Sequence, residues 1–325
     1  MESRFHAAVN AAISCSRPSS TLESVTVSYT MSSSTGVLTP KSNHLVEGFR
    51  TLSRWPVVPV AVVLFLVIIA IFAPLVAPHH PLEAEFDKRN TPPAWTEEGT
   101  SKYLLGTDHI GRDVLSRIIF GTRISLIVAG TVLAAGTFMG TALGVAAGYF
   151  GGTVDEIFMR LVDFLYALPF ILVALVAAVI WDPSLHLVII LLAIFTWPSF
   201  ARQVRAETLQ LKAMDYVAMA RVSGASGLRI ALKHILPGIV PTVVVMASLE
   251  VGHLVIAESV LSFLGVGIPA PDPSWGSMIS QGRNYITTAW WISFFPGVAI
   301  FLIVFSMNFL GDWLRDTLDP KLRQL

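Results

Sequence analysis

The sequence predicts an all-α, polytopic membrane protein with six transmembrane helices. Of its 325 residues, 54% are hydrophobic and only 14% are charged, against about 25% charged residues in an ordinary soluble domain. A soluble chain would have to bury this much apolar surface in one core, which a chain of this length rarely builds. The composition therefore excludes an ordinary cytosolic enzyme. Four stretches contain no Asp, Glu, Lys or Arg at all: 124–154, 164–181, 183–201 and 284–311.

The first 45 residues are unlike the rest of the chain. Sixteen of residues 1–46 are Ser or Thr, and no sustained apolar run occurs among them. Such segments bury too little apolar surface to fold, so we expect residues 1–45 to form a disordered cytoplasmic tail. Met31 offers an alternative start. The single cysteine, Cys15, excludes an intrachain disulfide framework and a multi-cysteine metal site.

Six later runs are each apolar over about 20 residues, the length that crosses a bilayer as a helix. The first lies between Pro56 and Pro78, and a helix tolerates proline at its start or ends at it. A polar segment, 79–122, separates the first run from the second. The fifth run is the least apolar, because it contains three ionisable residues. The expected spans are 56–78, 124–148, 157–181, 185–204, 236–262 and 290–312.

The distribution of Lys and Arg predicts the orientation, because these residues are enriched in cytoplasmic loops. With the N-terminus in the cytoplasm, 15 of the 22 Lys and Arg residues fall inside and seven fall outside. Both termini are therefore expected in the cytoplasm. The chain carries equal numbers of acidic and basic residues, so no overall field attracts nucleic acid.

The second predicted span contains a stripe of glycines, Gly136, Gly140, Gly144 and Gly148. Residues four apart lie along one side of a helix, and small residues there let a second helix approach closely within a membrane. The stripe predicts a helix–helix interface. Sliding of the two helices during a transport cycle and static close packing are both compatible with it.

Sequence motifs for ATP hydrolysis and for common hydrolases are absent. No Lys in the chain follows a Gly, which excludes the phosphate-binding motif G-x-x-x-x-G-K-[ST]. Neither H-E-x-x-H nor G-x-S-x-G occurs. Energy from ATP would have to arrive through another chain.

Asp108, His109, Arg112 and Asp113 resemble a catalytic or metal cluster at first sight. One histidine and two acids within six residues supply too few ligands for a metal site. We expect local roles instead: an Asp caps the start of a helix, and Arg112 pairs with a neighbouring carboxylate.

Glu250, His253 and Glu258 form the ionisable group of the fifth span. At about 100° per residue they fall within an arc of roughly 140°, so they can face a common surface. Ionisable groups within a membrane usually face a bundle interior or a wet cavity. They are candidates for the solute path, and hydrogen bonding between helices is the alternative.

The longest candidate internal loop is 203–237. Helix-forming residues stand on both sides of Gly224, which suits a break with an unusual backbone angle. Two short helices joined at this glycine would make a rigid projection on the inner face. Its mixed apolar and basic content indicates a partner.

Several ordered blocks resemble the C-class permeases of the dipeptide, oligopeptide and nickel group, a family of type I ABC importers. The Ala218-Met219-Ala220 run, Gly224 and His234–Pro237 resemble the family's "EAA" loop. The resemblance covers about residues 45–325. The other matching blocks are Leu105–Arg117, Gly121–Leu126, Leu261–Gly267, Pro273–Gly276 and Gly311–Pro320.

The resemblance implies the type I ABC importer transmembrane fold and a permease subunit that forms half of a peptide-translocating pore. This subunit is itself no enzyme and has no cofactor, because ATP and Mg²⁺ would bind partner ATPase subunits. The implied partners are a homologous B-class permease, two P-loop ATPases, an extracytoplasmic solute-binding protein and membrane lipid, in a bacterial inner membrane. The cargo is a dipeptide, oligopeptide, glutathione, haem or a nickel complex.

By the same resemblance, the 205–237 loop couples the permease to the ATPases, although Ala218 stands where the family usually has Glu. Asp108, Arg112 and Asp113 would lie in the external segment near the substrate entrance. The residues implied to contact the ATPase are Ala218, Met219, Ala220, Arg221, Gly224, Ala225 and Ser226.

The implied domain organisation has four parts. The tail 1–45 is followed by an N-terminal region with the first span and the external loop (46–121), the ABC type-1 transmembrane domain (122–312) and a cytoplasmic C-terminal tail (313–325). The alternative function is an ion-driven secondary transporter or channel, with Glu250, His253 and Glu258 as its proton relay.

Overall fold

The computed structural model describes residues 29–31, 38–40 and 56–318. The chain separates into a unit of residues 1–54 and a unit of residues 55–325. The described part of the first unit is a pair of antiparallel strands, β1 (Tyr29–Met31) and β2 (Leu38–Pro40). The rest of the predicted tail 1–45, including Cys15, lies outside the described residues, as do residues 319–325 of the predicted C-terminal tail.

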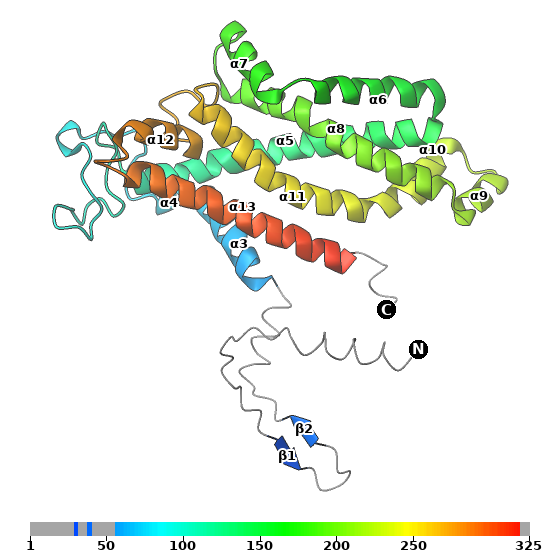
Figure 1. The fold of residues 1–325 in the computed structure, drawn as a ribbon, viewed down its shortest axis with the longest axis horizontal. Helices are drawn as coiled ribbons and strands as arrows, with labels where there is room; N and C mark the ends of the chain where they lie inside the picture. The colour runs from blue at the N-terminus through cyan, green and yellow to red at the C-terminus, as the bar shows by residue number, and fades with distance from the viewer. Residues whose placement is uncertain (1–28, 32–37, 41–55, 319–325) are drawn as a thin grey trace, which may run out of the picture. The chain divides into compact units, whose positions relative to one another are not determined.

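Four long helices run alongside one another in the second unit (Figure 1). Among the described residues, these four are long and apolar enough to cross a membrane singly, with the third counted from Gly227. The predicted spans 124–148, 185–204, 236–262 and 290–312 lie within them, except that the last helix begins at Trp291. The helices are α5 (Val114–Phe150), α8 (Leu185–Lys212), α11 (Leu236–Phe263) and α13 (Trp291–Leu318).

Capping residues extend two of these helices to or beyond the start of the apolar runs. The Asp113 side chain accepts a hydrogen bond from the Ser116 backbone N–H at 2.9 Å, so α5 begins ten residues before the predicted span. Ser184 caps α8 in the same way, through the N–H of Leu187 at 3.2 Å. Each cap satisfies a backbone donor that the first turn of a helix leaves unpaired.

The third predicted span, 157–181, is corrected to a bent pair of helices. α6 (Gly152–Ala167) and α7 (Phe170–Ile180) meet at an angle of 82°. The bend falls at Pro169, which has no N–H to donate and disfavours helical geometry at Leu168 before it. The pair counts as one broken span or as a re-entrant segment.

The first predicted span, 56–78, is also interrupted. α3 (Val57–Ile71) has 15 residues and is followed by the short α4 (Ala73–Val76), whereas a membrane-crossing helix needs about 20 residues. Pro74 explains the break, because it cannot donate to the carbonyl of Ala70. The sequence predicts six spans. The described residues contain four helices of membrane-crossing length, or five spans if the bent pair is counted as one, together with the shorter helix α3.

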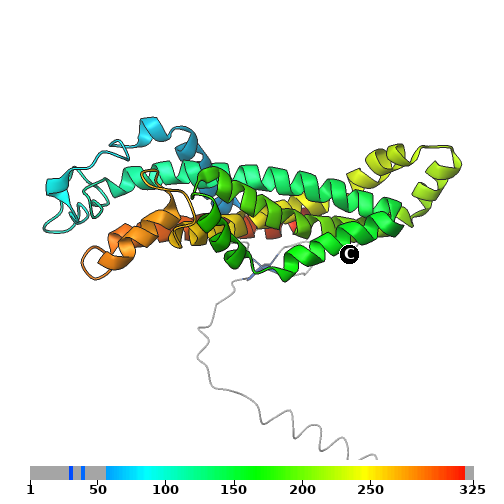
Figure 2. The same cartoon turned by 90° about the horizontal axis from the view of Figure 1, so that it is seen from above.

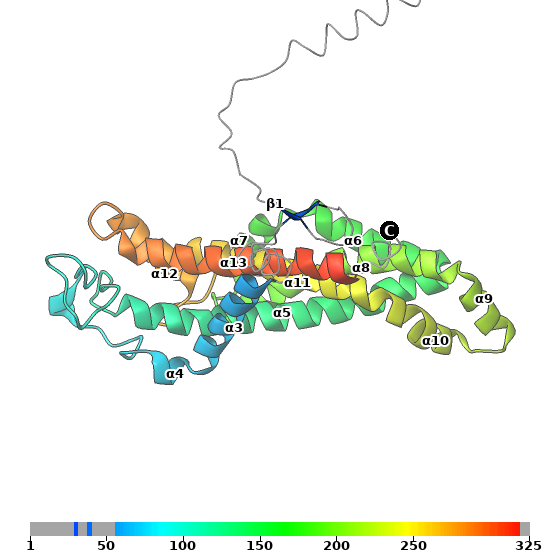
Figure 3. The same ribbon diagram turned by 90° about the horizontal axis from the view of Figure 1, so that it is seen from below.

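The connecting segments gather at two opposite ends of the long helices (Figures 1, 2 and 3). One end, here called the loop end, carries the segment 79–113 and α12 (Trp275–Gly282). The other, the α9 end, carries α9 (Asp215–Val222) and α10 (Gly227–Ile230). Two separate surfaces are thus presented at the two ends of one bundle.

The glycine stripe of α5 packs directly on α8, which confirms the predicted helix–helix interface. A Cβ at Gly140 would lie 2.5 Å from the carbonyl oxygen of Trp197, and one at Gly144 would lie 2.7 Å from that of Ala201. At Gly136 and Gly148 a Cβ would instead meet side-chain carbons of Thr196 and Thr208, at 2.8 and 2.7 Å. The two backbones approach too closely to admit any side chain. Whether they slide during transport stays a prediction.

Candidate functional site

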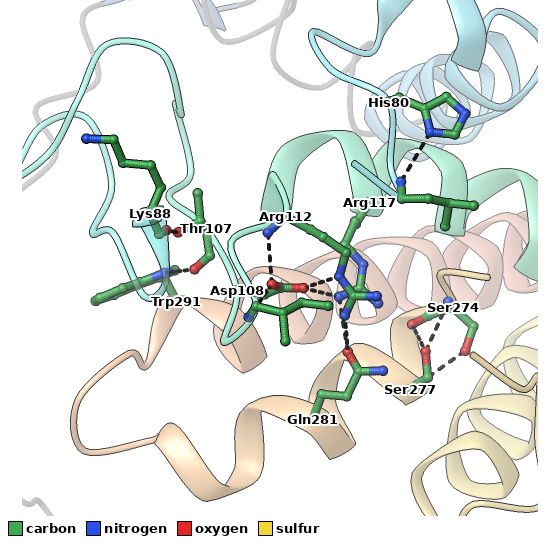
Figure 4. Close-up of polar contacts among 12 residues, drawn as sticks. His80, Lys88, Thr107, Asp108, Arg112, Arg117, Ser274, Ser277, Gln281 and Trp291 are labelled. Carbon is green, nitrogen blue, oxygen red and sulfur yellow. Dashed lines mark hydrogen bonds and ion pairs between the residues drawn. The ribbon is translucent and has the colours of Figure 1, made fainter. Parts of the chain in front are cut away.

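A buried ion cluster occupies the loop end (Figure 4). Asp108, in the segment 79–113, accepts hydrogen bonds from the backbone N–H groups of Ile110 and Arg112 at 2.9 and 3.0 Å. Its second oxygen accepts from Nε of Arg112 at 2.7 Å and from the Arg117 guanidinium on α5. Gln281 of α12 completes the cluster, because its Oε1 accepts from both arginines at 3.0 Å.

The two guanidinium groups determine the protonation of Asp108. Burial by itself would raise the pKa of this carboxyl group, but Arg117 and then Arg112 outweigh burial and lower the pKa below its ordinary value. The carboxylate is therefore charged at neutral pH. Burial lowers the pKa of neighbouring His109.

The cluster residues have the local roles that the sequence predicts. Asp113 caps α5, and Arg112 pairs with a carboxylate, that of Asp108. Sequence reasoning missed Arg117 and Gln281. The signal for Arg117 is present in the sequence, since an arginine in the first turn of an apolar helix must find a counter-charge. Gln281 carries no such signal.

Two tryptophans add hydrogen bonds between elements of the loop end. Nε1 of Trp291 on α13 donates to the carbonyl oxygen of Thr107 at 3.0 Å, as Figure 4 shows. Nε1 of Trp275 on α12 donates to the carbonyl oxygen of Ile118 at 3.2 Å. The segment 79–113 is thus tied to three helices and is not a loose loop.

Glu250 and His253 lie at a cleft midway along the bundle. One turn apart on α11, they bring Nδ1 of His253 to 3.8 Å from Oε2 of Glu250. The cleft has a volume of about 280 Å³ and lies between α11, α8 and the bend of α6 and α7, with Tyr166, Phe170 and Thr196 in its lining. A polar pair in a mainly apolar cleft is suited to contacting a polar solute.

Glu258 lies apart from this pair. Its side chain is 1% exposed and accepts hydrogen bonds from Ser262 at 2.7 Å and from Ser125 of α5 at 3.4 Å. The expected common surface therefore holds for Glu250 and His253 but is wrong for Glu258. An arc of about 140° is wider than one helix contact, so α5 covers one side of it while the cleft borders the other.

The α9 end contains the predicted glycine break. Gly224 has a φ of +81°, which a residue with a side chain rarely adopts, and the N–H of Ala225 donates to the carbonyl of Ala220 at 3.1 Å. Val217 is fully buried and anchors α9, whereas Met219 and Val222 are 70% and 90% exposed. The predicted contact residues Ala218, Met219, Ala220 and Arg221 are on α9, and Gly224, Ala225 and Ser226 form the turn after it.

The second of the two expected short helices is not separate. α10 continues through a π-helical turn, Ala231–Ile235, into α11, so one helix of 37 residues runs from Gly227 to Phe263. Pro237 accounts for the π turn, because its ring clashes with the carbonyl four residues earlier in a regular helix. The predicted internal loop 203–237 is therefore too long. Its first residues belong to α8 and its last residues to the helix that begins at Gly227, so only the segment between α8 and α10 connects them.

No group of three or more His, Cys, Asp or Glu side chains that could hold a metal ion occurs among residues 29–31, 38–40 and 56–318.

Two family models match the chain. One, described as the inner membrane component of binding-protein-dependent transport systems, matches residues 140–324. The other, described as the N-terminal transmembrane domain of oligopeptide transport permease C, matches residues 54–93. Together they include most of the residues from α3 to α13.

Relatives of known function match over most of their length. The dipeptide transport system permease protein of Escherichia coli K12 is 44% identical over 272 residues, which cover 84% of this chain and 91% of that protein. Its counterpart in Haemophilus influenzae is 39% identical, covering 84% and 92%. A glutathione transport system permease protein of Pectobacterium atrosepticum is 42% identical, covering 80% and 85%.

The fold is similar to that of a solved ABC transporter. The MetNI methionine ABC transporter in an inward-facing conformation superimposes with a TM-score of 0.53 at 20% identity, over 63% of this chain and 97% of that chain. A second crystal form of the same transporter gives a TM-score of 0.51 at 21% identity, over 62% and 96%.

Proposed function

Because the chain belongs to the family of inner membrane components of binding-protein-dependent transport systems, we propose that it is the permease subunit of an ATP-driven peptide importer and forms half of its pore. The observation that carries the peptide cargo is the 39–44% identity to dipeptide permeases over 84% of the chain. These relatives favour an ABC permease over the ion-driven transporter.

The α9 end is the proposed contact with ATPase subunits. Val217 fixes α9 to the bundle while Met219 and Val222 extend into solvent, and exposed apolar side chains on a rigid helix mark a docking surface. Residues 205–237 would couple ATP binding to the pore. ATP and Mg²⁺ would bind the ATPase subunits, since this chain has no phosphate-binding motif.

The loop end would then face away from the cytoplasm, toward an extracytoplasmic solute-binding protein. This orientation, with both termini cytoplasmic in a bacterial inner membrane, agrees with the excess of Lys and Arg in the segments assigned to the inside. A homologous permease of the B class would supply the other half of the pore.

Transport would proceed by alternating access. ATP favours one of two helix arrangements, because a ligand shifts an equilibrium only by its differential affinity for the two states. Glu250 and His253 would contact the peptide as it passes their cleft. Binding of ATP would open the path outward, and hydrolysis would reset it.

Purification of the complex through a tag on this chain tests the proposal. Reconstituted with its binding protein, the complex should hydrolyse ATP faster in the presence of di- and tripeptides. A complex that contains no ATPase subunit, or a lone chain that transports peptide under a proton gradient, would refute it.

A further inference from the structure

A second polar cleft lies between α8, α11 and α13, in the half of the bundle nearer α9. Its volume is about 500 Å³, within the range of roughly 300–1,000 Å³ typical of small-ligand sites. No residue of its lining belongs to the Glu250 cleft. The polar side chains that line it are Gln203, Glu207, Gln210, Thr242 and Arg315.

Glu207 is held in this cleft with half of its carboxylate unsatisfied. Its Oε1 accepts a hydrogen bond from the Thr242 hydroxyl at 2.9 Å. Its Oε2 is buried and has no hydrogen-bond partner among the residues that the structure describes. A buried polar oxygen without a partner is costly, so Glu207 favours a ligand that brings a cation or a strong donor.

Arg315 of α13 lines the same cleft and brings the opposite charge. Within the described ranges, no carboxylate lies within ion-pair distance of its guanidinium, although five other arginines of this unit are paired. A guanidinium binds a carboxylate through two parallel hydrogen bonds. Gln203 and Gln210 add amide groups that can pair with a peptide bond.

We propose that this cleft binds a zwitterionic peptide of two or three residues, with its ammonium group on Glu207 and its carboxylate on Arg315. The inference rests on the proposed peptide cargo. It adds a site within the permease that binds both charged ends of the peptide. A ligand with both charges neutralises both side chains at once and supplies the partner that the buried Oε2 of Glu207 lacks.

Equilibrium binding to the assembled complex in nanodiscs, without the binding protein or nucleotide, tests the site. The probes are radiolabelled alanyl-alanine, its N-acetyl form and its C-terminal amide. We expect each modification to weaken binding to the wild-type complex at least tenfold, because each removes one of the two charges. Equal binding of all three probes would overturn the proposal, and this comparison needs no variant that must fold.

Variants then assign each charge to a residue. Glu207→Gln should weaken binding of the free dipeptide about tenfold and abolish the distinction between the free and N-acetyl forms. Arg315→Gln should do the same for the free and amidated forms. Glu156→Gln is the matched control, since Glu156 is 70% exposed on α6 and pairs only with Arg160 among the described residues; it should bind as wild type. The assignment is wrong if Glu207→Gln still binds the free dipeptide more tightly than its N-acetyl form and Arg315→Gln still binds it more tightly than its amide.

The outcome is separable from that of the proposed function. Peptide-stimulated ATP hydrolysis with the binding protein present tests the function alone. A complex that responds to peptides in that assay but does not bind alanyl-alanine without the binding protein refutes this site and leaves the function standing. If no peptide stimulates hydrolysis while alanyl-alanine still binds selectively, the proposed function is wrong and the site stands.

Discussion

The guanidinium of Arg117 donates to Oε1 of Gln281 at 3.0 Å, joining residues that are 164 positions apart in the sequence. Arg117 belongs to α5 and Gln281 to α12, and both converge on the segment that carries Asp108. The loop end is therefore one connected structure, built from three parts of the chain around the buried carboxylate of Asp108.

Removing that carboxylate charge should destabilise the loop end. Asp108→Asn leaves two buried guanidinium groups without a counter-ion, and breaking a buried pair costs about 3–5 kcal/mol. We expect a lower thermal midpoint of the purified complex, measured by loss of its helical signal. Lys102→Gln is the control, because the Lys102–Glu85 pair is exposed, and it should leave the midpoint almost unchanged. An unaltered midpoint in Asp108→Asn would refute the role of the cluster.

The lowered pKa of Asp108 predicts acid sensitivity. A carboxyl group whose pKa is lower in the folded state stabilises the fold above its unfolded pKa, about 3.9, and this stabilisation disappears as pH falls through the folded value. The wild-type thermal midpoint should therefore fall below about pH 4. In Asp108→Asn this component should be missing, which parallel melting curves between pH 6 and pH 3 would reveal. Identical pH profiles would contradict the assignment.

A methyl group on the glycine stripe should separate α5 from α8. In Gly140→Ala the new Cβ would lie 2.5 Å from the Trp197 carbonyl oxygen, and overpacking of this kind costs about 1–3 kcal/mol. We expect reduced membrane abundance on immunoblots. Gly130→Ala, on the same helix, has open space at its Cβ and should accumulate as wild type. Equal abundance of both variants would mean that the contact is not tight.

A charge on the exposed face of α9 should uncouple the permease from its proposed ATPase subunits. Met219 is 70% exposed, so Met219→Asp should leave the thermal midpoint unchanged while reducing the ATPase subunits that co-purify at least fivefold. Trp95→Asp changes an exposed apolar residue at the opposite end and should retain them. Normal ATPase recovery with Met219→Asp would place the docking surface elsewhere.

Removing the Glu250 carboxylate on α11 should change transport and not folding. Glu250→Gln keeps the size of the side chain but removes its charge beside the cleft, so we expect altered peptide uptake at unchanged membrane abundance. Glu156→Gln is again the control. Uptake at the wild-type rate by Glu250→Gln vesicles would exclude Glu250 from the solute path.

The sequence predicts the long helices well and their ends poorly. Apolar length determines a membrane helix, but its ends depend on single capping residues such as Asp113, which lies outside the apolar run. The bend between α6 and α7 falls at Pro169 inside a charge-free stretch, where composition alone shows a continuous span.

Site residues were likewise predictable where their contacts are local in sequence, and not where the contacts join distant helices. Gly224 and the Asp108–Arg112 pair are local in sequence, and local geometry made both predictable. Gln281, and the cleft shared by Glu207 and Arg315, depend on how distant helices pack, which no pattern within one segment encodes.

The continuous helix from Gly227 to Phe263 fixes the direction of the side chains around Glu250 relative to those next to α9. Because α10 joins α11 without a loop, a rotation at the α9 end turns the Glu250 side chain through the same angle, apart from what the π turn Ala231–Ile235 absorbs. At 3.6 residues per turn, one residue inserted in this helix would rotate Glu250 by about 100° relative to α9. The number of residues in the helix Gly227–Phe263 therefore sets the direction in which Glu250 points relative to α9.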